Sequence, residues 1–151
     1  MPRYGYEVPP REVPKDDNGY FEELTKAVFR AGFSWKVIHD RWPDFQAAFD
    51  GFDINRVAAY DERDLDRLLS NEKIVRNGRK IEATIYNARV MREIIAEHGS
   101  FQAYLRSLDH MSYSERRKVL SKRFKNLGPT SVFVFLYSVG EEVPKWEDRK
   151  K

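Results

Sequence analysis

A short turn near the C-terminal end of the chain carries backbone groups that can bind an anion. Its residues, Lys-Asn-Leu-Gly at 125–128, separate two segments with helical patterns, so the stretch 114–140 is predicted to form a helix, a tight turn and a second helix. Gly128 permits a positive φ, and the first amides of the second helix have no intrahelical partner. The turn therefore predicts a phosphate site with the candidate residues Lys125, Asn126, Gly128 and Thr130.

The helices on either side of this turn have their own signals. Ser114 is the expected N-cap of the first helix, and Pro129 suits the first turn of the second, where Thr130 can help to cap it. The second helix is dense in apolar side chains that would fill a core in any case, namely Val132, Phe133, Phe135, Leu136 and Val139. An ordinary helical hairpin is the alternative, and the functional hypothesis concerns the turn alone.

A second turn, at Gly32 and Phe33, presents an aromatic side chain. Helical spacing of apolar residues runs from Tyr20 to Ala31 and stops at Gly32, and Ser34 is placed to cap the next helix. An exposed ring beside a glycine can wedge between stacked bases while the neighbouring nucleotide is extruded. The alternative is that Phe33 only packs against the helix that follows it.

The rest of the chain predicts further helices, because its apolar residues recur at spacings of three and four. The longest has a continuous apolar stripe and is the expected central scaffold. Asp61 and Ser100 are the expected N-caps of the helices after them. Besides the hairpin, the predicted helices span 20–31, 35–42, 44–52, 53–59, 62–69, 81–98 and 101–108. The predicted fold class is therefore all-α, a compact helical bundle.

Length and composition limit the domain organisation. A chain of 151 residues that is 41% hydrophobic and 34% charged can bury one core, and two domains would be cramped. Prolines and an Asp-Asp-Asn-Gly segment predict an extended arm over 1–19. We therefore expect a single helical domain over 20–143, with the hairpin at 114–140, and a charged tail over 144–151.

Composition also excludes several classes of protein. With no cysteine there is no disulfide framework and no thiolate metal site, and three scattered histidines do not predict a zinc cluster, so no metal and no cofactor is expected. The start lacks the apolar run of a signal peptide, and no segment reaches the ~20 apolar residues of a membrane span. The net charge is only +3, so a basic surface has to be local. We expect a monomeric, cytoplasmic protein with no membrane partner.

Several blocks of the sequence resemble the DNA-3-methyladenine glycosylase I (Tag) family of helix-hairpin-helix DNA glycosylases. They occur in the family's order and together cover about residues 20–140. The blocks are Ala31-Gly-Phe-Ser-Trp35, Phe49-x-x-Phe-Asp53, Val57-Ala-Ala, Arg76-x-x-Arg-Lys-Ile-x-Ala-x-Ile-x-Asn-Ala88, and the hairpin Phe124-Lys-Asn-Leu-Gly-Pro-Thr. The resemblance implies the helix-hairpin-helix glycosylase fold and double-stranded DNA with a damaged base as the partner, hence a nucleoid-associated protein.

The resemblance also implies roles for individual residues. Trp35 matches the family's pocket tryptophan, Phe33 stands where the family has leucine, and Arg3-Tyr-Gly-Tyr6 is similar to a segment whose last residue walls the base pocket. A tryptophan on an apolar helix face is otherwise most often a core residue. The basic run at 71–80 would by itself be a solvated face, but in the family it lies near the DNA, which makes Arg76, Arg79 and Lys80 candidates for phosphate contacts.

The sequence departs from the family at its polar site residues. Ala27 stands where the family's base-reading glutamate would lie, and Lys145 stands about where a zinc histidine would fall. The resemblance therefore implies neither the zinc site nor the same base recognition. The candidate catalytic carboxylates are Glu142 and Glu141, beyond the hairpin, with Glu23 and Asp40 as further candidates.

The resemblance predicts a monofunctional DNA repair enzyme that hydrolyses the N-glycosidic bond of an alkylated purine, such as 3-methyladenine, after base flipping. An N-alkylated purine already carries a positive charge, so it leaves readily and little general-acid catalysis is needed. Two alternatives remain open. One is a catalytically inactive helix-hairpin-helix DNA-binding module, and the other is a helical protein-interaction domain.

Overall fold

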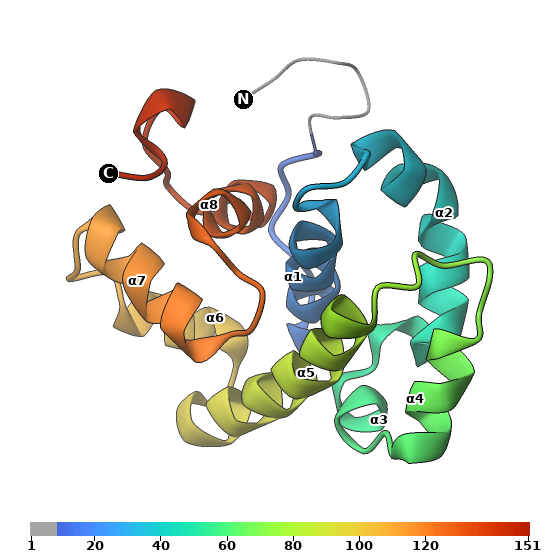
Figure 1. Ribbon diagram of the computed structural model, residues 1–151. Coiled ribbons are helices and arrows are strands. Elements are labelled where there is room, and N and C mark those ends of the chain that lie inside the picture. The colour runs from blue at the N-terminus through green and yellow to red at the C-terminus, as the bar shows by residue number, and fades with distance from the viewer. Residues whose placement is uncertain (1–8) are drawn as a thin grey trace.

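The computed structural model describes residues 9–151, and within them every regular element is a helix (Figure 1). This confirms the predicted all-α fold class. The α-helices are α1 (Asp17–Arg30), α2 (Trp35–Ala48), α3 (Ile54–Ala58), α4 (Glu62–Leu69), α5 (Gly78–His98), α6 (Phe101–Ser107), α7 (Tyr113–Arg123) and α8 (Pro129–Ser138). Two short 3-10 helices, η2 and η3, span Asp50–Phe52 and Trp146–Asp148.

Helices α1 and α5 form the centre of the molecule. Figure 1 shows α2, α3 and α4 on one side of this pair and α6, α7 and α8 on the other. Helix α5 packs against α3, α4 and α6, and α1 packs against both α5 and α8. The apolar stripe of α5, formed by Ile81, Ala88, Met91 and Ile94, is fully buried, as expected for the central scaffold. The two sides are therefore held together by α1 and α5, of which α5 has the longer apolar stripe.

Aromatic side chains fill the core on the α2 side. Trp42 stacks on Phe45 and Phe52, with ring centroids 5.0 and 5.1 Å apart, and Phe49 stacks on Phe52. The three phenylalanines are completely buried. Each such ring removes a large apolar area from water, which stabilises the fold by roughly 1.5–3 kcal/mol.

Several predicted helix starts are confirmed by their cap hydrogen bonds. The Ser34 hydroxyl accepts from the amide of Val37, and the Ser100 hydroxyl accepts from Ala103. Asp61 accepts from Asp64, whose side chain accepts from the Asp61 amide in return. These contacts satisfy amides that have no intrahelical partner.

Other predicted helix boundaries are wrong. Helix α7 is capped by Ser112 rather than Ser114, because Glu115 lies three residues after Ser112 and completes a reciprocal capping box. Helix α2 does not end before Pro43 but continues through it to Ala48. A proline inside a helix costs ~3 kcal/mol, and burial of the aromatic residues on either side of it offsets that cost.

Two helices also begin earlier than expected, and the C-terminal tail is partly helical. Asp16 caps α1, so the helix begins at Asp17 and the described part of the extended arm ends at residue 16 rather than 19. Asn77 caps α5, which therefore begins at Gly78, three residues before its first apolar residue. The expected charged tail contains η3.

Within residues 9–151, no helix combines the length and the apolar character that crossing a bilayer requires.

Candidate nucleic-acid interface

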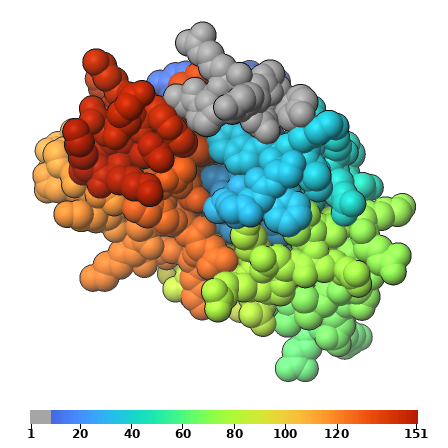
Figure 2. Space-filling view, turned by 45° about the horizontal axis from the view of Figure 1, so that its top comes forward, coloured from blue at the N-terminus to red at the C-terminus, as the bar shows by residue number. Residues whose placement is uncertain are grey.

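The hairpin, the start of α5 and the turn between α1 and α2 line one cavity of about 460 Å³. Figure 2 shows this face hollowed between the orange hairpin side, the cyan start of α2 and the green start of α5, with blue α1 at the floor. Among the residues that the structure describes, its charged lining groups are all cationic. The lining residues are Val28, Ala31, Asn77, Arg79, Lys80, Asn126, Gly128, Pro129, Thr130, Ser131 and Lys150.

The hairpin presents uncapped helix amides to this cavity. Gly128 is the N-cap residue of α8 and has no side chain, and no other side chain caps the helix, so the expected capping by Thr130 is wrong. Pro129 has no amide hydrogen, which leaves the amides of Thr130 and Ser131 as the first donors. The positive end of the helix dipole adds to their attraction for an anion. This cavity can therefore accept a phosphate.

The positive φ of the hairpin lies at Asn126 and not at Gly128. Asn126 has φ 55°, whereas Gly128 has φ −75° and ψ −179°, a conformation open to most residues. Asparagine tolerates the left-handed region because its short polar side chain can hydrogen-bond locally. The expectation that Gly128 supplies the left-handed residue of the turn is therefore wrong.

A buried asparagine on α5 holds the hairpin in place, and the sequence analysis missed it. The Asn87 side chain donates to the carbonyl of Lys125 at 3.1 Å and accepts from the amide of Lys125 at 2.8 Å. It is 1% exposed, so both bonds form away from water. A lone amide on the apolar side of α5 was the available signal.

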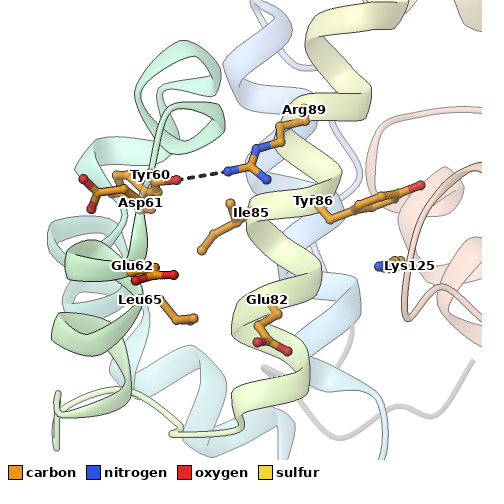
Figure 3. A pocket seen from close by; sticks show the side chains of 9 residues that line it. All are labelled: Tyr60, Asp61, Glu62, Leu65, Glu82, Ile85, Tyr86, Arg89 and Lys125. Atoms are coloured by element: carbon orange, nitrogen blue, oxygen red, sulfur yellow. Dashed lines mark hydrogen bonds between the residues drawn. The ribbon is translucent and has the colours of Figure 1, made fainter.

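The side chain of Lys125 points away from the cavity. Its Nζ atom lies 4.2 Å from the centre of the Tyr86 ring, and Figure 3 shows Tyr86 extending from α5 toward it. Both residues line a different groove of about 500 Å³, which also contains Asp61, Glu62 and Glu82. Carboxylates repel phosphates, so this groove does not suit a nucleic-acid backbone.

Lys80 is bonded to the protein rather than left free for a ligand. Its Nζ atom donates to the carbonyl oxygens of Phe29 at 3.2 Å and Ala31 at 2.5 Å, at the C-terminal end of α1. Burial lowers the pKa of Lys80 from its usual value. The side chain thus fixes the α1–α2 turn against the start of α5.

Arg76 and Arg79 are the exposed cations of this region. Arg79 lines the cavity, whereas Arg76 lies in the segment before α5 and does not line it. Neither residue forms an ion pair with any residue in 9–151, so both charges are available to an anionic ligand.

The α1–α2 turn places Phe33 at the surface, two residues after Ala31, which lines the cavity. Gly32 has φ 68°, and the Phe33 amide donates to the Arg30 carbonyl, which closes the turn. The Phe33 side chain is 43% exposed, a high value for phenylalanine. Phe33 therefore has the exposed ring that the wedge hypothesis requires.

Trp35 begins α2 two residues after Phe33 and is half-buried. Its Nε1 atom donates to the Arg30 carbonyl at 3.2 Å, and the Arg30 guanidinium lies 5.5 Å from the ring centre. Burial lowers the pKa of Arg30. Trp35 is thus packed from the Arg30 side without being sealed in the core. Tyr6, the other predicted pocket residue, lies outside the described residues.

The structure does not bring the candidate carboxylates to this cavity. Glu141 pairs with Arg106 beyond the C-terminal end of α8, about 15 Å of helix from the hairpin, and Glu142 beside it is exposed. Glu23 and Asp40 pair with lysines on their own helices. Ala27 is buried in the core. The predicted catalytic roles of Glu141 and Glu142 therefore gain no support from this placement.

Comparisons with known proteins identify a family. The methyladenine glycosylase family model matches residues 11–119. DNA-3-methyladenine glycosylase 1 of Escherichia coli is 37% identical over 78 residues, which are 51% of this chain and 42% of that protein. The match thus spans less than half the length of this relative. The Haemophilus influenzae DNA-3-methyladenine glycosylase is 24% identical over 83% of this chain and 78% of its own length.

Solved structures agree with the family match. The 3-methyladenine DNA glycosylase I of Staphylococcus aureus superposes with a TM-score of 0.78 and 27% identity, covering 89% of this chain and 82% of that one. Another 3-methyladenine DNA glycosylase I structure gives a TM-score of 0.74 and 30% identity, covering 85% and 81%. The likeness thus extends over most of the helical bundle.

Proposed function

The chain belongs to the methyladenine glycosylase family, and on that premise we propose that it is a DNA glycosylase that releases an alkylated purine, such as 3-methyladenine, from double-stranded DNA. The observation that carries the proposal is the cationic cavity between the hairpin, the start of α5 and the end of α1. We expect the protein to act as a monomer in the cytoplasm, on the nucleoid.

The hairpin holds the DNA backbone. A phosphate enters the cavity against the amides of Thr130 and Ser131, beside the side chains of Asn126 and Arg79. Such contacts fix the position of the protein on the duplex without reading its sequence.

The α1–α2 turn carries the groups that act on the damaged base. Phe33 enters the base stack where the damaged nucleotide leaves it, and the everted base stacks on Trp35 two residues further on. Lys80 bonds this turn to the start of α5, and Asn87 bonds the hairpin to the same helix, so wedge and hairpin are held at a fixed separation. A phosphate and an everted base can thus be bound at once.

The leaving group supplies much of the driving force for the reaction. An N-alkylated purine is cationic in the nucleotide and neutral after the glycosidic bond breaks, so its departure needs no protonation. Among the described residues no carboxylate lines the cavity, and no group of three or more His, Asp or Glu side chains could hold a metal ion. The reaction proposed here therefore rests on binding and stacking, followed by attack of water on the sugar.

Base release from a methylated duplex tests this proposal. We expect the native chain to release an alkylated purine and Trp35→Ala to lose that release while keeping duplex affinity. Leu69→Ala, at an exposed apolar residue of α4 that does not line the cavity, serves as the control and should retain release. Unchanged release by Trp35→Ala would remove Trp35 from the pocket.

A second function is favoured by one specific observation, the absence of a carboxylate from the lining of the described cavity. The chain would then be a DNA-binding module without glycosylase activity. Salt-sensitive duplex binding by the native chain, with no release of any alkylated purine, would support the module and reject the glycosylase.

A further inference from the structure

The C-terminal segment 146–151 is folded onto the hairpin. The Trp146 ring packs edge-on against Phe133 of α8, with ring centroids 5.4 Å apart. Arg149 lies over the Trp146 ring, with its guanidinium carbon 3.9 Å from the ring centre, and it donates to the Trp146 carbonyl at 3.0 Å. The apolar contact of Trp146 with Phe133 therefore holds this charged segment against the protein surface.

Two hydrogen bonds join this segment to both helices of the hairpin. Arg149 Nε donates to the hydroxyl of Thr130 in the first turn of α8, at 3.2 Å. Arg117 of α7 donates to the carbonyl of Lys150 at 3.3 Å. Since α7 and α8 flank the turn at 124–128, the segment has a defined position beside that turn.

This position places new positive charge at the cavity. Lys150 lines the cavity with Asn126 and Gly128, although Lys150 lies 24 positions after Asn126 in the sequence. Neither Arg149 nor Lys150 forms an ion pair with a described residue, whereas Lys151 pairs with Asp148 at 2.8 Å. Lys150 is therefore a cation without a counter-charge, next to the uncapped amides of α8.

We propose that the segment 146–151 is a second phosphate-binding wall of the DNA site, in which Lys150 contacts a backbone phosphate beside the one held by the hairpin. Arg149 is a positioning residue that fixes the segment on Thr130. The inference rests on the proposed DNA binding and assigns a role to a segment outside the match to the family, which ends at residue 119.

The salt dependence of duplex binding tests the role of Lys150. One phosphate contact contributes about 0.9 to the slope of log affinity against log salt, so we expect Lys150→Ala to lower the steepness of that slope by about 0.9. The ratio of native to variant affinity should then fall by about 3.5-fold between about 50 and 200 mM salt. Lys151→Ala removes the neighbouring charge that Asp148 already neutralises, and we expect its slope to match that of the native chain.

A second variant tests whether the position of the Lys150 charge matters, as distinct from its presence. Trp146→Ala keeps every cation but removes the anchor on Phe133, and we expect its salt slope to fall as in Lys150→Ala. The double variant should fall no further, because both changes remove the same contact. Circular dichroism and thermal unfolding check that each variant keeps the helical fold.

The outcomes distinguish this inference from the proposed function. A native slope in Lys150→Ala, with a reduced slope in Arg79→Ala, would overturn the role of the segment and leave the hairpin site standing. A native slope in Trp146→Ala would show that the fold of the segment is irrelevant, and would also overturn it. If the native chain does not bind duplex DNA at low salt, the proposed function and this inference both fail.

Discussion

The ammonium group of Lys80 donates a 2.5 Å hydrogen bond to the carbonyl of Ala31, which ties the first turn of α5 to the turn that carries Gly32 and Phe33. The same group also donates to the Phe29 carbonyl, so two carbonyls at the C-terminal end of α1 are satisfied by a cation on another helix. A lysine in a basic run is thus a structural link between the start of α5 and the α1–α2 turn.

Lys80→Ala and Arg79→Ala should separate structure from binding. Removing the Lys80 ammonium leaves the Phe29 and Ala31 carbonyls without their donor, and we expect a loss of about 1–2 kcal/mol in the free energy of unfolding. Arg79 is exposed and forms no ion pair within residues 9–151, so its removal should leave stability unchanged and lower the salt slope of DNA binding by about 1. Urea unfolding and salt titrations measure the two effects. Equal stability of both variants would contradict the structural role of Lys80.

Phe33→Ala should impair base release without impairing folding. The ring is 43% exposed, so we expect a stability change within about 0.5 kcal/mol. Phe33→Leu keeps an apolar wedge and should retain most of the release activity. Leu69→Ala, at a residue of similar exposure (39%), is the matched control and should release bases normally. Native activity in Phe33→Ala would reject the wedge.

Two substitutions at Asn126 should differ because of its backbone conformation. Asn126→Gly suits φ 55° and should fold normally, losing only the contacts of the side chain. Asn126→Val places a β-branched residue in the left-handed region, and we expect a destabilisation of about 1–2 kcal/mol together with weaker DNA binding. Thermal unfolding and binding titrations of the two variants check this, and equal stability would mean that the turn can relax.

Gly128 should tolerate a side chain structurally but not functionally. A Cβ atom there meets no atom within 4 Å, and φ −75° is open to alanine and valine. We expect Gly128→Val to have the same unfolding temperature as the native chain. Its side chain should, however, hinder the approach of a phosphate to the α8 amides. Native duplex affinity in this folded variant would count against the phosphate site.

Arg11→Ala should loosen the N-terminal arm. Arg11 donates to the carbonyls of Tyr137 and Glu141, each at 2.7 Å, and its guanidinium lies over the Tyr137 ring. Because the side chain is exposed, we expect a modest loss of about 1 kcal/mol, measured by urea unfolding. Base release should fall by more than duplex affinity if the arm carries Tyr6 to the pocket. Lys15→Ala, at an exposed arm residue, is the control. Equal base release by both variants would show that the arm has no role in the reaction.

Local and long-range contributions to this protein can be separated residue by residue. The caps at Ser34, Asp61 and Ser100 were predictable because each depends on contacts within three residues along the chain. Periodicity predicted the helices for the same reason. The boundary at Pro43 was missed because burial of the neighbouring aromatic residues, a property of the packed core, outweighs the local preference of proline.

The sequence by itself determined the all-α class, the hairpin of two helices with a tight turn, and the blocks that mark the family. Only the tertiary structure decided what the site residues do. Lys80 is bonded across 49 residues to Ala31, Asn87 across 38 residues to Lys125, and Glu141 across 35 residues to Arg106. Partners so far apart are chosen by the packing of whole helices, and no local pattern of residue types encodes that choice.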